Sequence, residues 1–185
     1  AGHPLRAFGF TWCADMTSSE GVSAGIDTVY GVHWYGRSSG GPDGSLEWGL
    51  DAGDYSLTGN RVSLETYFAA MEEYISYASI NSPTTTMVFT TGPVDAIYGE
   101  FIGEAGYQGH LKYEAIRDYV AADASRVLFD VADILAYDDN GIPATQTWSG
   151  YTYPVITTTN KGDESIGHIG SAGAIRLAKA QWWML

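Results

Sequence analysis

Residues 87–91 (MVFTT) and 111–131 (LKYEAIRDYVAADASRVLFDV) decide the fold of this chain. Residues 87–91 and 127–131 are short runs rich in β-branched and aromatic side chains, which is typical of strands covered on both faces. Between them, apolar and aromatic side chains recur at spacings of three and four, as along one face of a helix. The two stretches therefore predict a strand, a helix and a strand. The helical residues are Leu111, Ala115, Ile116, Tyr119 and Val120.

The same alternation continues toward both ends of the chain. Residues 8–12 predict a further buried strand. A helix with Ser63 as its N-cap is expected before residues 87–91, and another helix is expected at the C-terminus. Their inward-facing stripes consist of Leu64, Tyr67, Phe68, Met71, Tyr74 and Ile75 in the first and of Ala174, Leu177, Ala178, Gln181 and Trp182 in the second.

Strands that alternate with helices pair in parallel through right-handed crossovers, with helices on both faces of the sheet. We therefore expect a three-layer α/β/α fold with a mainly parallel, flavodoxin-like sheet. The length of 185 residues fits one domain, residues 1–185. Ligands of such folds bind beyond the carboxyl ends of the strands, so a site is expected after Trp12, Thr91 and Val131.

Two segments do not fit the alternation, residues 17–59 and 138–162. Both are expected to be long loops that wall a site or an interface. Trp34, Trp48 and Trp148 would give these loops flat faces suited to stacking on sugar rings or to protein interfaces. Packing in the core also explains aromatic residues of this kind.

The charge of the chain excludes some classes of partner. Lys and Arg together number 9 against 22 Asp and Glu, which gives a net charge of -13. Such a charge repels the phosphates of nucleic acids and anionic membrane surfaces. No apolar run approaches the ~20 residues that a membrane-spanning helix needs. We expect a soluble protein that neither binds nucleic acid nor inserts into a membrane.

The composition favours a location outside the cell or on its surface. The chain has 13 Tyr, 6 Trp, 23 Gly and few lysines, which is typical of secreted carbohydrate-active proteins. Ala1 is not a start methionine, so a processed N-terminus is expected. Cys13 is the only cysteine, and beside Trp12 it is expected to be a small buried hydrophobe. An internal disulfide is excluded, whereas an intermolecular one stays open.

Residues 162–170 (GDESIGHIG) carry the most informative chemistry, because an acid and a histidine precede the C-terminal helix. His168 can act as a general base, and a carboxylate beside it can fix its tautomer and stabilise the imidazolium. Asp163 is the first candidate for that carboxylate, and Glu164 is the alternative. A second interpretation is that His168 only caps the helix or bonds a backbone carbonyl.

This acid-then-histidine loop, followed by a helix with Ala-Lys-Ala-Gln-Trp-Trp at residues 178–183, resembles the last block of SGNH (GDSL-type) hydrolases. The resemblance runs from about Phe8 to Leu185 and implies an SGNH-like fold and ester hydrolysis, with Asp163 and His168 as the dyad. Family members usually carry Asp-x-x-His, whereas four residues separate Asp163 from His168 here.

The resemblance also implies a role for residues 92–95 (GPVD), where the family places a Gly-x-Asn-Asp block. Gly92 and Asp95 would then belong to the oxyanion region and the wall of the site. No Asn is present there, and no Gly-Asp-Ser turn occurs in the chain to supply the family's nucleophilic serine. Either the first strand and its serine lie upstream of Ala1, or the domain is non-catalytic.

Two functions follow from these alternatives. The first is an extracellular SGNH-like ester hydrolase that acts on an acylated polysaccharide. The second is a non-catalytic surface module: a structural subunit of an assembly or filament, or a glycan-binding domain. A missing first strand would leave an exposed sheet edge, so a homo-oligomer or a retained N-terminal fragment is an expected partner under both.

No cofactor is expected apart from calcium. Asp138, Asp139 and Asn140 are candidate oxygen ligands for calcium in a loop, although they lack the spacing of an EF-hand. Zinc is not expected, because one cysteine and four dispersed histidines show no paired ligand spacing.

Overall fold

The computed structural model describes residues 6–9, 26–27, 32–34, 61–62, 64–94, 103–163 and 168–184. Several predictions concern residues outside this part of the chain: Cys13, Trp48, Ser63, Asp95, Glu164 and most of residues 17–59. Trp34 lies in a short strand, but the structure describes only its backbone.

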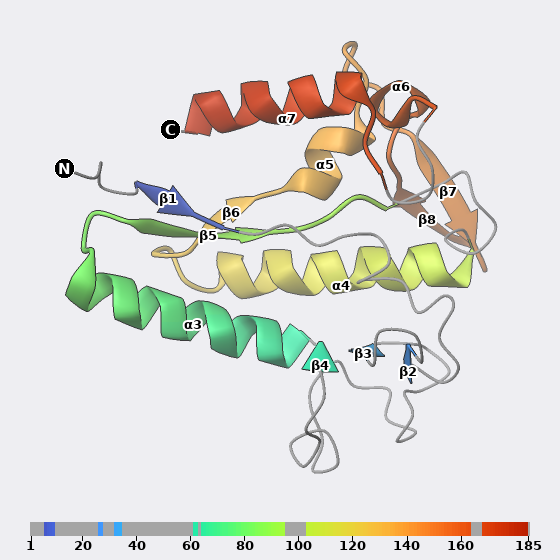
Figure 1. Cartoon of the computed structure of the whole chain (residues 1–185). Coiled ribbons are helices and arrows are strands. Elements are labelled where there is room, and N and C mark those ends of the chain that lie inside the picture. Colours follow the sequence, from blue (N-terminus) through green and yellow to red (C-terminus); the bar gives the residue numbers. More distant parts are fainter. Residues whose placement is uncertain are drawn as a thin grey trace.

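A parallel sheet of three strands forms the centre of the described fold (Figure 1). Its order is β1 (Ala7–Phe8), β5 (Thr86–Thr90) and β6 (Val127–Phe129), and both neighbouring pairs are parallel. The crossover between β1 and β5 ends with helix α3 (Leu64–Asn81), and the next contains α4 (Glu104–Ala121). The predicted mixed α/β class with parallel strands is confirmed.

The end of β6 differs from the prediction that residues 127–131 form one strand. The strand ends at Phe129, and helix α5 (Val131–Ala136) begins two residues later. The cause is Asp130, whose carboxylate accepts a hydrogen bond from the backbone N–H of Asp133 at 3.2 Å and thereby caps α5. An Asp at such a position satisfies an N–H group that the first helical turn leaves without a partner.

Helices cover both faces of the sheet because the buried side chains of the strands alternate. Met87 and Phe89 pack into the cluster formed with α3 and α4. Val88 and Phe129 face the other way, toward α5 and the C-terminal helix α7 (Ser171–Met184). Figure 1 shows α3 and α4 on one side of β5 and β6, and α5 and α7 on the other.

Residues 138–162, expected to be a long loop, contain regular structure, so that expectation was wrong. β7 (Thr145–Trp148) and β8 (Tyr151–Pro154) form an antiparallel hairpin, and the helical turn α6 (Thr158–Lys161) follows. Ser149 and Gly150 make the two-residue turn, and both have positive φ angles, 49° and 86°. Positive φ at both positions gives a turn whose twist matches that of the two strands.

Ser149→Asn is expected to stabilise the hairpin, because Asn adopts positive φ with less strain than Ser and Asn-Gly is a preferred pair in such turns. The free energy of unfolding should rise by about 0.5 kcal/mol, measured by urea denaturation. Ser149→Val should lower it, since a β-branched residue resists positive φ. Equal effects of the two substitutions would contradict the assigned turn.

A second small sheet contains β2 (Ile26–Asp27), β3 (Val32–Trp34) and β4 (Arg61–Val62) in that order. The first pair is antiparallel and the second is parallel. This sheet contains parts of residues 17–59 and lies near the start of α3 (Figure 1). None of the helices in the described part of the chain combines the length and the apolar character needed to cross a membrane.

Candidate functional site

Asp163 and His168 lie on the two arms of one short loop between α6 and α7. The arms meet at their base, where the N–H of Gly170 donates to the carbonyl of Asn160 at 2.9 Å. A Cβ added to Gly162 would lie 3.7 Å from the Cα of Gly170. Both candidate side chains are exposed, and Glu164 lies outside the described residues. Asp163 directly follows Gly162 and His168 precedes Gly170 by two residues, so both side chains are attached near the point where α6 and α7 meet.

Glycines fix the geometry of this loop base. Gly162 ends α6 with φ of 62°, in the region that glycine adopts without strain. A Cβ at Gly170 would lie 2.6 Å from the carbonyl oxygen of Lys161, and one at Gly173 would lie 2.4 Å from that of Asn160. The backbones of α6 and α7 thus approach too closely for any side chain at these positions. This close approach fixes the start of α7 against α6.

Asn160 ties the loop base to the rest of the fold. Its buried side-chain amide donates to the carbonyls of Leu135 at 2.8 Å and Tyr137 at 3.1 Å, at the end of α5. Its backbone N–H donates to the hydroxyl of Thr157, which caps α6. Nothing in the sequence pattern singled out Asn160.

The carboxyl ends of β5 and β6 meet through a partly buried polar network that the sequence did not reveal. Asp130 accepts hydrogen bonds from Nε of Arg117 at 2.6 Å, from Nη2 of Arg117 at 2.9 Å and from the hydroxyl of Thr91 at 2.7 Å. The Thr91 hydroxyl in turn accepts from the N–H of Ala132 at 2.9 Å. Glu114 also accepts from Arg117. The network locks the two strand ends together.

The network keeps Asp130 ionised. Burial alone would raise the pKa of Asp130, but the hydrogen bonds from Arg117 and Thr91 and the charge of the guanidinium outweigh it, so the pKa lies below its ordinary value. The matching contacts raise the pKa of Arg117 in spite of its burial. Every oxygen of Asp130 is engaged, which identifies it as a structural carboxylate rather than a proton-transfer group.

Gly92 lies on a separate segment, directly after β5, and is buried. The backbone around it is fixed, because the N–H of Ile156 donates to the carbonyl of Val94 at 2.8 Å. The hydroxyl of Tyr113 lies 3.5 Å from the carbonyl of Pro93. The predicted oxyanion region thus has a rigid backbone as far as Val94, and Asp95 lies outside the described residues.

Trp148 belongs to an aromatic group formed by α4 and the β7–β8 hairpin. The ring of Tyr107 stacks on that of Tyr151 with a centroid distance of 5.1 Å and lies 5.4 Å from the ring of Trp148. Tyr151 is 57% exposed, whereas Trp148 is partly buried against the core. Both interpretations of Trp148, stacking surface and core packing, therefore have support.

His110 lies at the edge of this aromatic group. Its ring stacks on that of Tyr153 at 6.1 Å, and its Nδ1 lies 3.7 Å from a carboxylate oxygen of Glu114. Burial lowers the pKa of His110, and this effect exceeds the opposing one of Glu114. His110 is therefore neutral at neutral pH.

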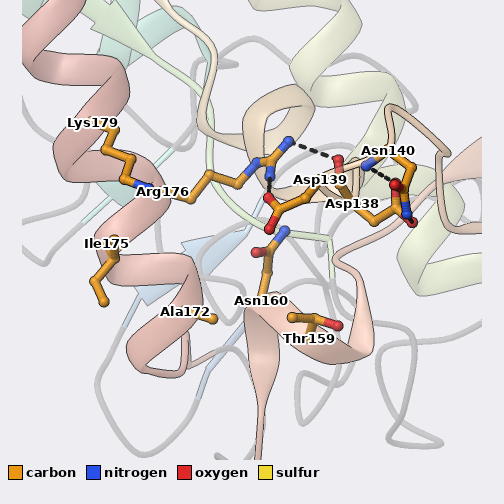
Figure 2. A pocket seen from close by; sticks show the side chains of 9 residues that line it. All are labelled: Asp138, Asp139, Asn140, Thr159, Asn160, Ala172, Ile175, Arg176 and Lys179. Atoms are coloured by element: carbon orange, nitrogen blue, oxygen red, sulfur yellow. Dashed lines mark hydrogen bonds and ion pairs between the residues drawn. The ribbon is translucent and has the colours of Figure 1, made fainter.

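A pocket of about 470 Å³ lies between α7, α6 and the turn at residues 138–140 (Figure 2). Arg176 reaches from α7 to that turn and donates to the carboxylate of Asp139 at 2.6 Å and to the carbonyl of Asp138 at 3.0 Å. The lining residues are Asp138, Asp139, Asn140, Thr159, Asn160, Ala172, Ile175, Arg176 and Lys179.

The calcium candidates Asp138, Asp139 and Asn140 form one wall of this pocket, but their carboxylates already have partners. Asp138 accepts from the N–H groups of Asn140 at 2.9 Å and Ile142 at 2.8 Å. These bonds, the one from Ile142 foremost, lower the pKa of Asp138. Asp139 pairs with Arg176. In the part of the chain that the structure describes, no cluster of three His, Cys, Asp or Glu residues suits a metal ion.

Comparisons with known proteins give this chain no family. No family model matches it, and neither a curated protein nor a solved structure does.

Proposed function

We propose that this chain is an SGNH-like ester hydrolase domain of the cell exterior that acts on an acylated polysaccharide. The observation that supports the proposal is the hydrogen bond from Gly170 to Asn160, which holds the end of helix α6, just before Asp163, beside the backbone that leads from His168 into α7. A parallel β1-β5-β6 sheet, with helices on both faces, is compatible with this family. In such sheets ligands bind at the carboxyl ends of the strands.

In this proposal His168 accepts the proton of a serine hydroxyl as its oxygen attacks the ester carbonyl. The ester C–O bond then breaks, the acyl group stays on the serine, and His168 returns the proton to the leaving sugar hydroxyl. Water repeats the same steps to release the acid and free the serine. Asp163 or Glu164 orients the imidazole. The serine comes from a segment upstream of Ala1.

Acyl release is the direct test of the proposal. The protein at its native length, with any upstream segment that accompanies it, is incubated with a 4-nitrophenyl ester and with an acetylated polysaccharide. We expect hydrolysis well above the uncatalysed rate with both substrates. A native protein that is folded and begins at Ala1, yet releases no acid from either, would overturn the proposal.

A non-catalytic surface module is the second candidate, and a specific observation favours it. Residues 92–94 hold no Asn, no Gly-Asp-Ser turn occurs in the chain, and the exposed ring of Tyr151 stacks on the partly buried Tyr107. Such a stack suits sugar rings. Retention of the protein on an insoluble polysaccharide without any acyl release, lost in Tyr151→Ala, would support this candidate.

We also propose that the β1 edge pairs with a strand from another copy or from a retained N-terminal fragment. Among the described residues β1 pairs only with β5. An open edge is a template for a further strand. Light scattering with intact mass analysis should find an oligomer, a filament or a second polypeptide; a monomer that carries only this chain at high concentration would contradict it.

A further inference from the structure

The pocket between α7, α6 and the turn at residues 138–140 has the size and the polar groups of a ligand site. Its volume of about 470 Å³ lies within the range of small-molecule sites, roughly 300–1,000 Å³. We propose that it binds a sugar residue that carries a carboxylate, such as one hexuronate unit of a polysaccharide. The four charged groups of the pocket differ in whether they already have a partner within the protein.

One ion pair and one hydrogen-bonded turn engage three of the four charged groups of the pocket. The carboxylate of Asp138 accepts two backbone N–H groups of its own turn, from Asn140 and Ile142. The carboxylate of Asp139 is paired with Arg176 at 2.6 Å. These contacts leave Lys179 as the charged group whose partner would come from a ligand.

Lys179 stands one helical turn beyond Arg176 on the same side of α7 (Figure 2). No ion pair joins Lys179 to a carboxylate among the residues that the structure describes. Helix α7 contains these two cations and no acidic residue, in a chain whose net charge is -13. The four charges of the pocket sum to zero. Because Asp138 accepts hydrogen bonds from its own turn and Asp139 pairs with Arg176, the ammonium donors of Lys179 are the groups that a ligand carboxylate can meet.

Arg176 adds fixed donors beside Lys179. Its Nε donates to the carbonyl of Ile134 at 2.8 Å, and its two Nη atoms donate to Asp139 and to the carbonyl of Asp138. A guanidinium has five N–H groups, so two remain for a ligand after these three bonds. Because the three bonds hold the side chain in place, little rotamer entropy is lost when a ligand binds.

The remaining walls favour a sugar over a simple anion. Thr159 contributes a hydroxyl, and Asn140 contributes an amide whose Nδ2 also donates to Asp138 at 3.4 Å; hydroxyls and amides are the groups that recognise ring hydroxyls. Ala172 and Ile175 contribute an apolar surface for the C–H face of a ring, and Ile175 is 56% exposed. A carboxylate meeting Lys179 and hydroxyls meeting the polar walls would use both features of the pocket.

The pocket is built from the same segments as the loop that carries Asp163 and His168. Asn160 lines the pocket, and its carbonyl accepts the bond from Gly170 that closes the loop. Ala172, which also lines the pocket, follows His168 by four residues. The inference thus rests on the proposed polysaccharide substrate and names its class: an acidic polysaccharide, one unit of which sits beside the candidate dyad.

Nuclear magnetic resonance titration of the native protein with galacturonate and with galactose tests this site without any turnover. Galacturonate should shift the amide signals of Ala172, Ile175 and Lys179 and bind about tenfold more tightly than galactose, as expected for one charge-assisted hydrogen bond. Lys179→Gln should reduce galacturonate binding to the level of galactose, and Lys179→Arg should retain the preference. Arg6→Gln, which removes an exposed charge at the other end of the sheet, is the matched control and should change nothing.

Equal binding of the two sugars, or an undiminished preference in Lys179→Gln, would overturn the inference. The ester hydrolase proposal has a separate readout, which is acid release. Galacturonate binding without acid release would support the sugar site and contradict the hydrolase proposal. Acid release without galacturonate binding would support the hydrolase proposal and contradict the sugar site.

Discussion

His168→Ala is expected to lower kcat/KM for a 4-nitrophenyl ester by about 10³-fold, because the serine would lose the base that accepts its proton. His168 is exposed and lies outside both core clusters, so the protein should stay folded and the melting temperature should change little. Stopped assays of initial rate together with thermal unfolding measure the two quantities on the same preparation. An unaffected rate in His168→Ala would remove this residue from the mechanism.

Three further variants sharpen this experiment. His110→Asn is the control, because His110 packs among aromatic rings and should affect stability more than rate. Asp163→Ala and Glu164→Ala identify the orienting acid, since only the carboxylate that pairs with His168 should reproduce most of the loss. If both acid variants keep the full rate, His168 acts without an orienting carboxylate from this loop.

Asp130→Ala is expected to lower the free energy of unfolding by about 2–3 kcal/mol, which is the largest stability effect that we predict. The substitution removes the cap of α5 and leaves Arg117 and Thr91 partly buried without their acceptor. The side chains of Arg117 and Asp130 are only 21% and 22% exposed, so water replaces the lost bonds poorly. Urea denaturation at neutral pH measures the loss.

Glu114→Gln is the matched control for Asp130→Ala. Glu114 also pairs with Arg117, but its side chain is 45% exposed, and exposed pairs contribute about 0–1 kcal/mol. A loss in Asp130→Ala no larger than that in Glu114→Gln would show that the network at the ends of β5 and β6 contributes little.

The free energy of unfolding should also decrease as the pH is lowered, because the pKa values of Asp130 and His110 are both lowered in the folded state. The pKa of Asp130 is lowered on folding, so its contribution is complete above its unfolded pKa near 4 and is lost as pH falls through the folded value. The pKa of His110 is lowered too, so protonation below about 6.5 favours the unfolded state. Urea denaturation between pH 7 and pH 3 should show a loss of stability from each residue. In Asp130→Asn the loss at the lower pH should be absent.

The sequence predicted the parallel sheet and its helices because those features depend on local periodicity. The stripes in residues 64–75, 111–120 and 174–182 each fall within an observed helix. The inward face predicted for the last helix was wrong, because only Leu177 of that stripe packs against the core and Trp182 is 82% exposed. Periodicity does not mark boundaries, however. The run VLFDV at residues 127–131 has strand-like composition throughout, and only the capping bond of Asp130 shows that the last residue belongs to α5.

The β7–β8 hairpin was missed because its aromatic and threonine residues were interpreted as a loop. The Ser-Gly pair at residues 149–150, between two such runs, was the available signal for a two-residue turn. Helix α6 has four residues, too few for any periodic pattern, and only the cap at Thr157 marks its start.

The residues of the candidate site also differ in how well local sequence could predict them. Asp163 and His168 were selected because they are close in sequence, between α6 and α7, and their role stays a prediction. Arg117, Asp130 and Thr91 meet across separations of 13 and 39 residues, and no local pattern encodes such a contact. The pocket at Lys179 likewise combines three separate segments, so it emerged only from the fold.

The central claim is that His168 activates a serine, and labelling with a fluorophosphonate tests it most directly. This reagent attaches covalently to an activated serine, and mass spectrometry identifies the modified residue. We predict one labelled serine in the folded native protein, in a segment that precedes Ala1, and a strongly reduced labelling rate in His168→Ala. A folded native protein in which no serine is labelled, or in which His168→Ala is labelled as fast, would contradict the claim and favour the non-catalytic surface module.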